Sequence, residues 1–582
     1  MKQHLESLLH AALEQLVAQT NTSLLLDDLQ ISLERPRDPS HGDWSSSIAM
    51  VLAKPLKQAP RIIAEQLIAL MSTNHQIETI ELAGPGFINF KLSTAYLQEQ
   101  LEHIWSSPNC GIAVIPHPET VVIDYSSPNL AKEMHVGHLR STIIGDALAR
   151  ILAFQGQNVI RQNHIGDWGT QFGMLIAHLD EMQQESKENF NLTDLEGFYQ
   201  TAKQRFDAEP AFADTARAWV VKLQAHDPHA YALWQRFISL SLAHCQSLYQ
   251  RLGVCLQPSD IRAESAYNEA LPSVISTLQS QGLLTDQEGT KCVFLEQFIG
   301  KDKQPLPIIV QKRDGGYLYA TTDLAALEYR HQKLQADRVL YVVDARQSLH
   351  FQQIFTLALQ AEFISPSMRL EHVDFGMILD KAGKPFKSRE GGVTKLVDLL
   401  DEAERRAAEL IISKNPNMSS EDCQSMAKII SIAAVKYADL SKNRMSDYVF
   451  DWDTMLSFEG NTAPYLLYAN TRIHSLFQKA ALQPEQLTQE FQLQAEQELM
   501  LGKHLAVFPE LIATVAMKAT PHLLCTYLYE LAGLFSSFYE ACPILSAADT
   551  SSQQSRLKLA ALSSKILEQG LTLLGIHTLK RM

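Results

Sequence analysis

The chain has 582 residues, of which 46% are hydrophobic, so it is long and apolar enough to build several globular domains. Its formal net charge of −15 argues against unselective coating of nucleic acid, and any polyanion must bind at a chosen surface. The seven cysteines include no C-x-x-C pair, and no apolar run reaches the ~18 residues needed to span a bilayer. The composition therefore predicts a protein of the reducing cytoplasm with no membrane partner.

The first 112 residues are predicted to form a small α+β domain. An N-terminal helix at 1–20 precedes a second helical stretch at 52–70 and a strand-like stretch at 77–93. Glutamates interrupt the leucines of the first helix, which is not the pattern of a signal peptide. A Pro-rich joint at 113–120 then marks a change of pattern.

Residues 113–395 alternate between strand and helix patterns. "TVVIDYSS" predicts a buried strand, "LRSTIIGDALARILAFQG" a helix that ends at Gly156, and "NVIRQNHIGD" a second strand. This order predicts a right-handed βαβ unit in a parallel sheet. An insertion at about 180–300, with a β ribbon at "EGTKCVFLEQF", interrupts the alternation, which resumes with "RVLYVV" and "HVDFGMILD". Nearly all of residues 396–582 is predicted to be helical.

His135 and His138 lie in "SSPNLAKEMHVGHLRST", the loop between the first strand of this sheet and its first helix. Ligands bind at the carboxyl ends of such strands, and a helix N-terminus favours phosphate. Gly137 between them is expected to let a bound group approach the backbone. A metal site is not indicated, because a third ligand and the i, i+4 spacing are both missing. From this motif alone, two ordinary loop histidines are an equal alternative.

A cationic loop follows the last predicted strand. The stretch "KAGKPFKSREGG" at 381–392 holds four cations among small residues and is suited to a departing polyphosphate. Taken alone, a solvated turn is the commoner explanation, but together with the histidine pair the loop indicates phosphate chemistry. Neither the P-loop pattern nor G-x-G-x-x-G occurs at the expected place, so a P-loop NTPase and a dinucleotide oxidoreductase are not supported.

The histidine loop, followed by "NHIGDWGTQFGMLI", resembles the HIGH region of class I aminoacyl-tRNA synthetases, specifically of arginyl-tRNA synthetases. The resemblance covers the whole chain and extends through "NRMSDYVFDWDTMLSFEGNTAPYLLYANTRI". It implies an α/β fold of the class I type: a Rossmann-like parallel sheet, an N-terminal α+β domain, an internal insertion and an all-α C-terminal domain. The second signature departs from K-M-S-K-S and reads "KPFKS", which leaves the division of labour between Lys384 and Lys387 open.

The resemblance implies that the protein activates L-arginine with ATP and Mg²⁺, releases pyrophosphate, and transfers arginine to the 3′-terminal adenosine of tRNA(Arg). A cytoplasmic monomer is the corresponding expectation. The implied catalytic residues are His135, His138, Lys384 and Lys387, and the implied ATP-binding residues add Pro128, Asn129, Lys132 and Gly137.

A planar guanidinium calls for carboxylates in a bidentate fork. The resemblance implies an arginine pocket made of Asp124, Ser126, Asn129, His138, Tyr319, Asp323 and Gln347. Each has a plain alternative: Asp323 as a helix cap, Tyr319 as a core residue, and Gln347 as part of an exposed turn.

For tRNA, the resemblance implies that the C-terminal helices take the anticodon loop and that residues 1–112 take the outer corner. Candidate anticodon-side contacts are Tyr465, Tyr468, Asn470 and Arg472, and a core role for each tyrosine is as probable as a contact.

Three other functions remain open. The first is a different H-x-G-H nucleotidyltransferase. The second is a non-catalytic synthetase-like tRNA-binding protein, although damaged signatures are expected there. The third is another class I specificity, of which the cysteinyl type requires zinc-ligand cysteines.

Overall fold

The computed structural model forms two compact units, each described here by itself. The first contains Met1–Gly111, Phe477–Pro509 and Gly533–Ser563, and the second contains Ile112–Leu476, Glu510–Ala532 and Ser564–Met582. The C-terminal helices thus contribute to both units, while the functional boundaries at 112/113 and 395/396 stay a prediction. The residues that the structure describes are 2–20, 29, 31–36, 38–71, 74–130, 132–185, 195–301, 303–386 and 394–581.

The first unit begins with the predicted α+β fold. Leu5, Leu9 and Leu13 of the N-terminal helix are buried against Ile63 of the third helix, which accounts for their helical spacing. A four-stranded antiparallel sheet has the order β1-β2-β4-β3. The elements of this part are α1 (Lys2–Thr20), β1 (Leu33–Glu34), η2 (Pro39–His41), β2 (Trp44–Ser46), α2 (Ile48–Leu56), α3 (Pro60–Leu70), β3 (Ile77–Ala83), β4 (Phe87–Leu92) and α4 (Thr94–Ser106).

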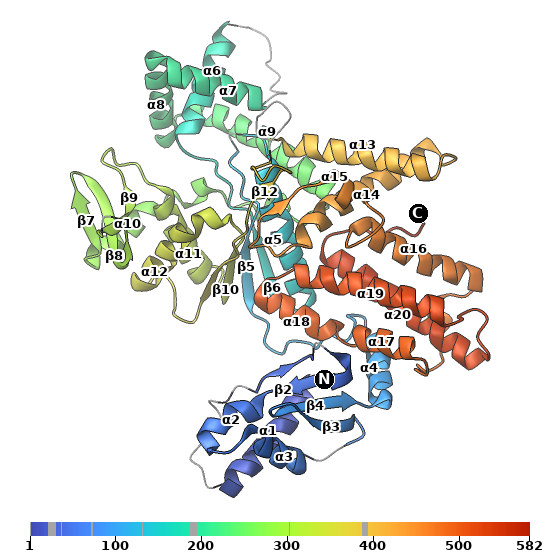
Figure 1. Cartoon of the computed structure of the whole chain (residues 1–582). Helices are drawn as coiled ribbons and strands as arrows, with labels where there is room; N and C mark the ends of the chain where they lie inside the picture. The colour runs from blue at the N-terminus through green and yellow to red at the C-terminus, as the bar shows by residue number, and fades with distance from the viewer. Residues whose placement is uncertain are drawn as a thin grey trace. The chain divides into compact units, whose positions relative to one another are not determined.

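A four-stranded parallel sheet with the order β11-β10-β5-β6 lies at the centre of the second unit (Figure 1). Its strands are β5 (Thr120–Asp124), β6 (Asn158–Gln162), β10 (Arg338–Tyr341) and β11 (Arg369–His372). Val122 pairs with Ile160 on one side and Val339 on the other. The helix α5 (Val136–Phe154) connects β5 to β6, and Gly156 follows it with a φ of +94°, so the predicted βαβ unit is confirmed.

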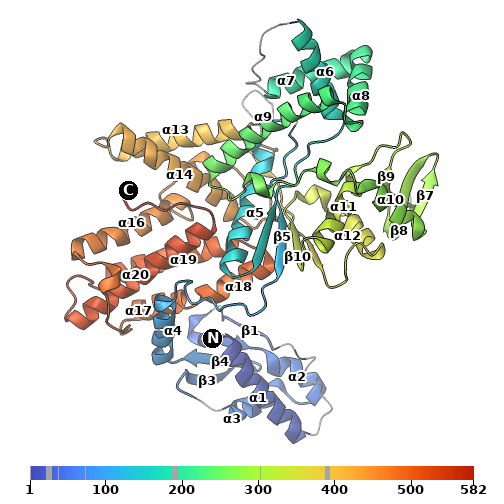
Figure 2. The same ribbon diagram turned by 180° about the vertical axis from the view of Figure 1, so that it is seen from behind.

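Helices cover both faces of this sheet (Figures 1 and 2). α11 (Tyr319–Gln332) and α12 (Ser348–Gln360) pack on one face, where Leu324, Ile354 and Leu357 join Val122 and Val339 in a common core. α5 lies on the other face and is buried almost throughout, because α13 (Leu396–Lys414) and α14 (Ser420–Leu440) pack against it as well. Helix α5 therefore lies between the sheet and the helices α13 and α14.

Between β6 and α11 the chain forms helices and a three-stranded antiparallel sheet β7-β8-β9 rather than the expected ribbon, while the insertion bounds at about 180–300 stay a prediction. The elements of this region are α6 (Thr170–Glu185), α7 (Leu195–Ala208), α8 (Pro210–Gln224), α9 (Pro228–Leu252), η3 (Pro258–Asp260), η4 (Glu264–Tyr267), α10 (Leu271–Ser280), β7 (Leu284–Gln287), β8 (Thr290–Ile299) and β9 (Pro305–Gln311).

The strand predicted over 372–380 is only partly right. β11 ends at His372, and a short strand β12 (Ile378–Leu379) begins after a bend and pairs in parallel with β13 (Tyr448–Val449). The physical reason is that Gly376 in the bend packs directly against the backbone of Asp447, so the chain turns away from the sheet there.

The remaining C-terminal region is helical, as predicted. Its further elements are α15 (Trp452–Met455), α16 (Ala463–Ala480), η6 (Pro484–Gln486), α17 (Glu496–Leu505), α18 (Phe508–Lys518), α19 (His522–Ala541) and α20 (Thr550–Leu573). The short helix η5 (Ala345–Gln347) belongs to the sheet region, directly ahead of α12. Contrary to the sequence expectation, Glu496–Lys518 is long and apolar enough to cross a membrane by length and composition. It forms the two helices α17 and α18, whose Leu501, Leu505, Phe508 and Ile512 are buried.

Candidate active site

The loop after β5 begins with two strained residues. Ser126 and Ser127 have φ values of 70° and 43°, a region that residues other than glycine seldom occupy. The strain is held by hydrogen bonds, since the N–H of Ser127 donates to Oδ1 of Asn163 over 3.0 Å. Further along, the N–H of Leu130 donates to the carbonyl of Gly166 over 2.9 Å, so the loops after β5 and β6 lie side by side.

His135 and His138 together form the N-terminal cap of α5. Nδ1 of His135 accepts from the N–H of Gly137 over 3.0 Å, and Nδ1 of His138 accepts from the N–H of His135 over 3.1 Å. Because each Nδ1 is an acceptor, the ring proton of a neutral imidazole lies on Nε2. Burial, with a smaller contribution from His135, lowers the pKa of His138 to about 3. His138 is therefore a neutral donor of hydrogen bonds at physiological pH.

Gly137 has a different role from the one its position suggests. A Cβ on Gly137 would lie 2.7 Å from Cε1 and 2.9 Å from Nδ1 of His135. The imidazole of His135 fills the space that the sequence reserves for a bound group. Gly137 is thus needed for the histidine cap itself.

The chain that follows the cationic loop meets the start of α5. The N–H of Val136 donates to the carbonyl of Thr394 over 3.0 Å, and the N–H of Leu396 donates to the carbonyl of Met134 over 2.9 Å. At its beginning, the exposed Lys384 is held through its N–H, which donates to Oδ1 of Asp380 over 2.9 Å. The predicted residue Lys387, with Ser388 and Arg389, lies outside the described residues. The residues that follow the second signature, Thr394 and Leu396, therefore lie at the start of α5.

Three further residues of the predicted ATP set lie near the loops just described. The ammonium of Lys132 is 4.6 Å from the ring centroid of Tyr199 on α7, a cation–π contact. Pro128 is buried and its carbonyl accepts from the N–H of Gly166 over 3.1 Å, whereas Asn129 is exposed.

Asp323 and Tyr319 meet at His350. Nε2 of His350 lies 2.6 Å from Oδ2 of Asp323, and the ring of Tyr319 meets the His350 ring edge-on at 4.8 Å. Tyr319 is 62% exposed, so it is not the core residue of the alternative explanation. Gln347 is exposed one turn before His350, at the start of α12. His350, which contacts both candidate residues, is a residue that the sequence did not single out.

Glu264 is a second residue that the sequence missed. Burial, followed by the negative charges of Asp323 and Asp167, raises the pKa of Glu264 to about 7. Its N–H donates to the carbonyl of Ile165 over 3.0 Å, which holds it beside the loop after β6. Carboxylates crowded in this way favour a cation between them. No short sequence motif marks Glu264. Its neighbour Asp167 lies in a segment quoted for the resemblance, whereas Glu264 does not.

Asp124 and Ser126, both predicted to meet the substrate, are engaged inside the protein. Oδ2 of Asp124 lies 2.6 Å from Nη2 of Arg330, and Oδ1 accepts from the hydroxyl of Ser127 over 2.8 Å. The hydroxyl of Ser126 lies 2.7 Å from that of Tyr249. The Asp124 carboxylate is therefore already paired with an arginine of the chain itself.

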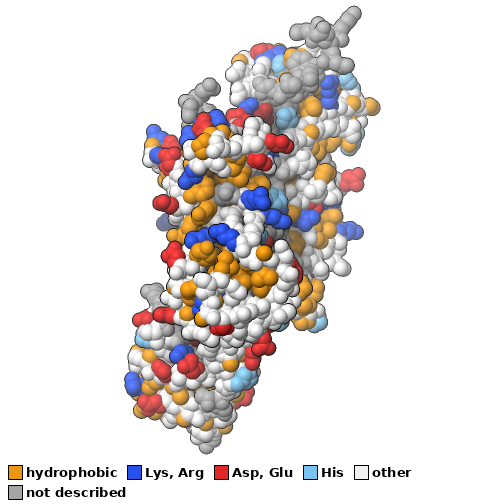
Figure 3. Space-filling model, turned by 90° about the vertical axis from the view of Figure 1, so that its right-hand side faces the viewer, with side chains coloured by type: hydrophobic (Ala, Val, Ile, Leu, Met, Phe, Trp, Pro, Cys, Tyr) orange, Lys and Arg blue, Asp and Glu red, His pale blue; other side chains and the backbone are white. Residues whose placement is uncertain are grey.

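The four candidate tRNA contacts on α16 differ in exposure. Tyr468 is 50% exposed, and Tyr465 is half-buried with its ring 5.6 Å from that of Tyr529. Asn470 is fully buried, with its amide bonded to Ser564 and Glu568, so its side chain is not on the surface. Arg472 is partly exposed. Figure 3 shows Lys and Arg side chains beside exposed hydrophobic ones on the face that carries the C-terminal helices.

Three family models match the chain. "tRNA synthetases class I (R), catalytic domain" covers residues 100–452, "DALR anticodon binding domain" covers 466–582, and "Arginyl tRNA synthetase N terminal domain" covers 3–92. The match over residues 100–452 places the protein among the class I aminoacyl-tRNA synthetases.

Two similar proteins identify the family within this class. The arginine–tRNA ligases of Idiomarina loihiensis and Psychromonas ingrahamii are 54% and 53% identical, over 100% of this chain and of theirs. The chain belongs to the arginyl-tRNA synthetases, so the resemblance inferred from the signatures is confirmed.

Solved structures agree with the predicted fold class. The arginyl-tRNA synthetase of Plasmodium falciparum has a TM-score of 0.86 at 29% identity, covering 100% of this chain and 99% of that one. The Thermus thermophilus enzyme has a TM-score of 0.80 at 22% identity, covering 100% of both, and bears on the fold alone. The α/β class I fold is confirmed.

Proposed function

We propose that this protein is an ATP-dependent arginine–tRNA ligase. It joins L-arginine to the α-phosphate of ATP with release of pyrophosphate, and then transfers arginine to the 3′-terminal adenosine of tRNA(Arg). The observation that carries the proposal is that η4 with Glu264 packs against α11 with Asp323, which brings two negative charges together, in the unit whose helix α5 begins with the histidine cap. A pocket for a cation beside a site for phosphates fits arginine and ATP together.

In the activation step the protein positions reactants and stabilises charge on the phosphates. Nε2 of His138 donates a hydrogen bond to ATP as the α-phosphate becomes pentavalent, and His135 acts beside it. Lys384 and Lys387 hold the departing pyrophosphate. The exposed Lys132 and Asn129 line the same loop, while Asp124 and Ser126 position that loop rather than touch arginine.

Mg²⁺ comes to this site with ATP. Among the described parts of the chain, no group of three or more His, Cys, Asp or Glu is placed to hold a metal ion. Magnesium bound mainly through substrate phosphates is common in nucleotide enzymes. The ion supplies charge neutralisation on the phosphates, and the lysines of the cationic loop share that work.

The proposed arginine pocket selects the substrate side chain by its charge and its shape. Asp323 and Glu264 face the guanidinium, Tyr319 covers it from the exposed side, and Gln347 lines the opposite wall. Buried carboxylates left unpaired by a neutral side chain reject that substrate strongly, so an editing site is unnecessary.

For tRNA we propose Tyr468, Tyr465 and Arg472 on the anticodon side, where aromatic rings stack on unpaired bases. Asn470 is left out because it is buried. We further propose that the protein acts in the cytoplasm as a monomer, with no membrane partner.

Aminoacylation of total tRNA, measured separately with each amino acid, tests this function. The expected result is incorporation of arginine alone, into a fraction of tRNA that purified tRNA(Arg) saturates. Binding of tRNA without any charging would instead favour the non-catalytic alternative.

A further inference from the structure

The segment Asp374–Gly376, here called the junction segment, joins β11 to β12, from which the cationic loop begins. Its backbone touches two parts of the site. The N–H of Ala345 in η5 donates to the carbonyl of Phe375 over 3.1 Å. Nη1 of Arg140 on α5 donates to the carbonyl of Gly376 over 2.8 Å. The junction segment thus contacts both the turn that carries Gln347 and the helix that carries the histidines.

Arg444, in the turn between α14 and β13, holds the junction segment from the helical side. Its Nη1 donates to the backbone carbonyl of Asp374 over 2.5 Å and to Oδ1 over 2.7 Å, while Nε donates to the carbonyl of Ala519 over 3.0 Å. Its own carbonyl accepts from the N–H of Gly376 over 2.9 Å. One guanidinium fork, with donors at fixed angles, ties the junction segment to the turn after α18.

The packing at Gly376 leaves the junction segment little freedom to slide. A Cβ on Gly376 would lie 2.5 Å from Oδ1 and 2.8 Å from the backbone nitrogen of Asp447. The N–H of Met377 donates to the same Oδ1 over 2.6 Å. A displacement of the turn at 444–447 therefore displaces the start of β12 as well.

We propose that Arg444 is a positioning residue of the aminoacylation reaction. It fixes the junction segment, and through β12 it fixes where the cationic loop begins relative to the histidine cap. The proposal rests on the role proposed above for the cationic loop. Without Arg444 the loop starts from a range of positions, so the adenylate-forming step slows, whereas arginine binding at Asp323 stays as it is.

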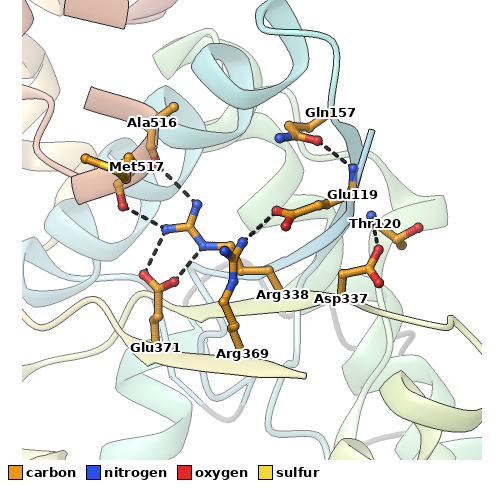
Figure 4. A network of polar contacts seen from close by, with 9 residues as sticks. All are labelled: Glu119, Thr120, Gln157, Asp337, Arg338, Arg369, Glu371, Ala516 and Met517. Carbon is orange, nitrogen blue, oxygen red and sulfur yellow. Dashed lines mark hydrogen bonds and ion pairs between the residues drawn. The ribbon is translucent and has the colours of Figure 1, made fainter. Parts of the chain in front are cut away.

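Arg338 provides a matched control, because its guanidinium bonds to the end of α18, close to the Ala519 carbonyl that Arg444 binds, and not to the junction segment (Figure 4). Its guanidinium pairs with Glu371 over 2.7 and 2.8 Å and donates to the carbonyls of Ala516 and Met517 over 3.1 and 3.2 Å. Loss of Arg338 therefore loosens the end of α18 while Asp374 keeps its partners.

The test measures arginine-dependent ATP–pyrophosphate exchange by the full chain with tRNA present. Arg444→Met is expected to lower kcat by about tenfold or more with the KM for arginine within about twofold, the pattern of a lost transition-state arrangement. Arg338→Met is expected to keep kcat within about threefold. Arg444→Lys should regain part of kcat, because an ammonium still reaches Asp374 but not Ala519 at once.

A wild-type kcat in Arg444→Met, or equal losses of kcat in Arg444→Met and Arg338→Met, overturns the proposal. If Arg444→Met does not fold, Asp374→Asn with Arg444 intact carries the test, and unchanged kcat there overturns it too. The variant Lys384→Ala distinguishes a failure of the proposed role of the cationic loop from a failure of the proposed role of Arg444. Normal exchange in Lys384→Ala refutes the proposed loop role, whereas a loss there beside a normal Arg444→Met refutes only the role of Arg444.

Discussion

Arg330 and Asp124 form a buried ion pair in which Nη2 lies 2.6 Å from Oδ2. Arg330 is fully buried, and its Nε also donates to Oε1 of Gln162 over 2.6 Å. The carboxylate in turn holds Ser127 at the strained turn after β5. An internal guanidinium therefore pairs with the carboxylate that the resemblance assigns to bound arginine, and the carboxylate also bonds to the loop after β5.

Arg330→Met should destabilise the fold by about 3–5 kcal/mol, because it leaves the Asp124 charge buried and uncompensated. Urea unfolding followed by circular dichroism measures this. The control is Arg369→Met, which removes the partially exposed pair with Glu119 and should cost less than about 1 kcal/mol (Figure 4). Similar small losses in both variants would show that Asp124 does not depend on Arg330.

His135→Ala and His138→Ala should each lower adenylate formation by about a hundredfold or more, the scale of losing a transition-state donor, while the fold persists. Gly137→Ala should lower it in the same direction, since its Cβ displaces the His135 ring. Gly533→Ala is the matched control, because nothing lies within 4 Å of its Cβ. Exchange kinetics of wild-type level in both histidine variants would remove the phosphate assignment.

Local patterns were enough to predict the βαβ unit, because alternating apolar runs and the break at Gly156 act over neighbouring residues. The histidine cap follows from its place at the start of a helix. Glu264 and His350 were not predictable in this way, since their relation to Asp323 arises only when segments about 30 to 60 residues apart fold together. The engagement of Asp124 by Arg330 has the same cause, because 206 residues separate them.

The binding of arginine should depend on pH through Glu264. Its pKa lies near 7 without substrate, and a bound guanidinium favours the carboxylate, so binding below pH 7 releases a proton. Affinity for arginine should then fall by up to about tenfold for each pH unit below 7. Calorimetry in buffers of different ionisation enthalpy measures the proton release.

In Glu264→Gln that release should vanish, and arginine should bind more weakly with a flatter pH profile. The folding stability of the unliganded protein depends on pH in the opposite direction to its affinity for arginine. Because its pKa is raised, Glu264 keeps its proton to a higher pH in the folded state than in the unfolded state. Its contribution to the free energy of unfolding is therefore fully present below pH 4.5 and is lost as pH rises through about 7. Proton release unchanged in Glu264→Gln would assign the titration to another group.

Exchange of pyrophosphate with arginine and ATP should be negligible until tRNA is added. The cationic loop leads through Thr394 into α13, and a preference of about 3 kcal/mol for its active position raises that population about a hundredfold. By reciprocity, arginine with ATP should tighten tRNA binding equally. tRNA with an oxidised terminal ribose keeps transfer from consuming the adenylate. Full exchange without tRNA would mean that the site is already assembled.

We propose that arginine specificity rests on recognition of charge by Asp323, and a comparison of arginine with citrulline tests this proposal most directly. Citrulline has a neutral urea group of nearly the same shape. The measurement is kcat/KM for both substrates, with tRNA present, in the wild type and in Asp323→Asn. The wild type should prefer arginine by about 10⁴-fold or more. Asp323→Asn should lose about 2–5 kcal/mol toward arginine and little toward citrulline, whereas an unchanged KM and rate for arginine would contradict the assignment of the pocket.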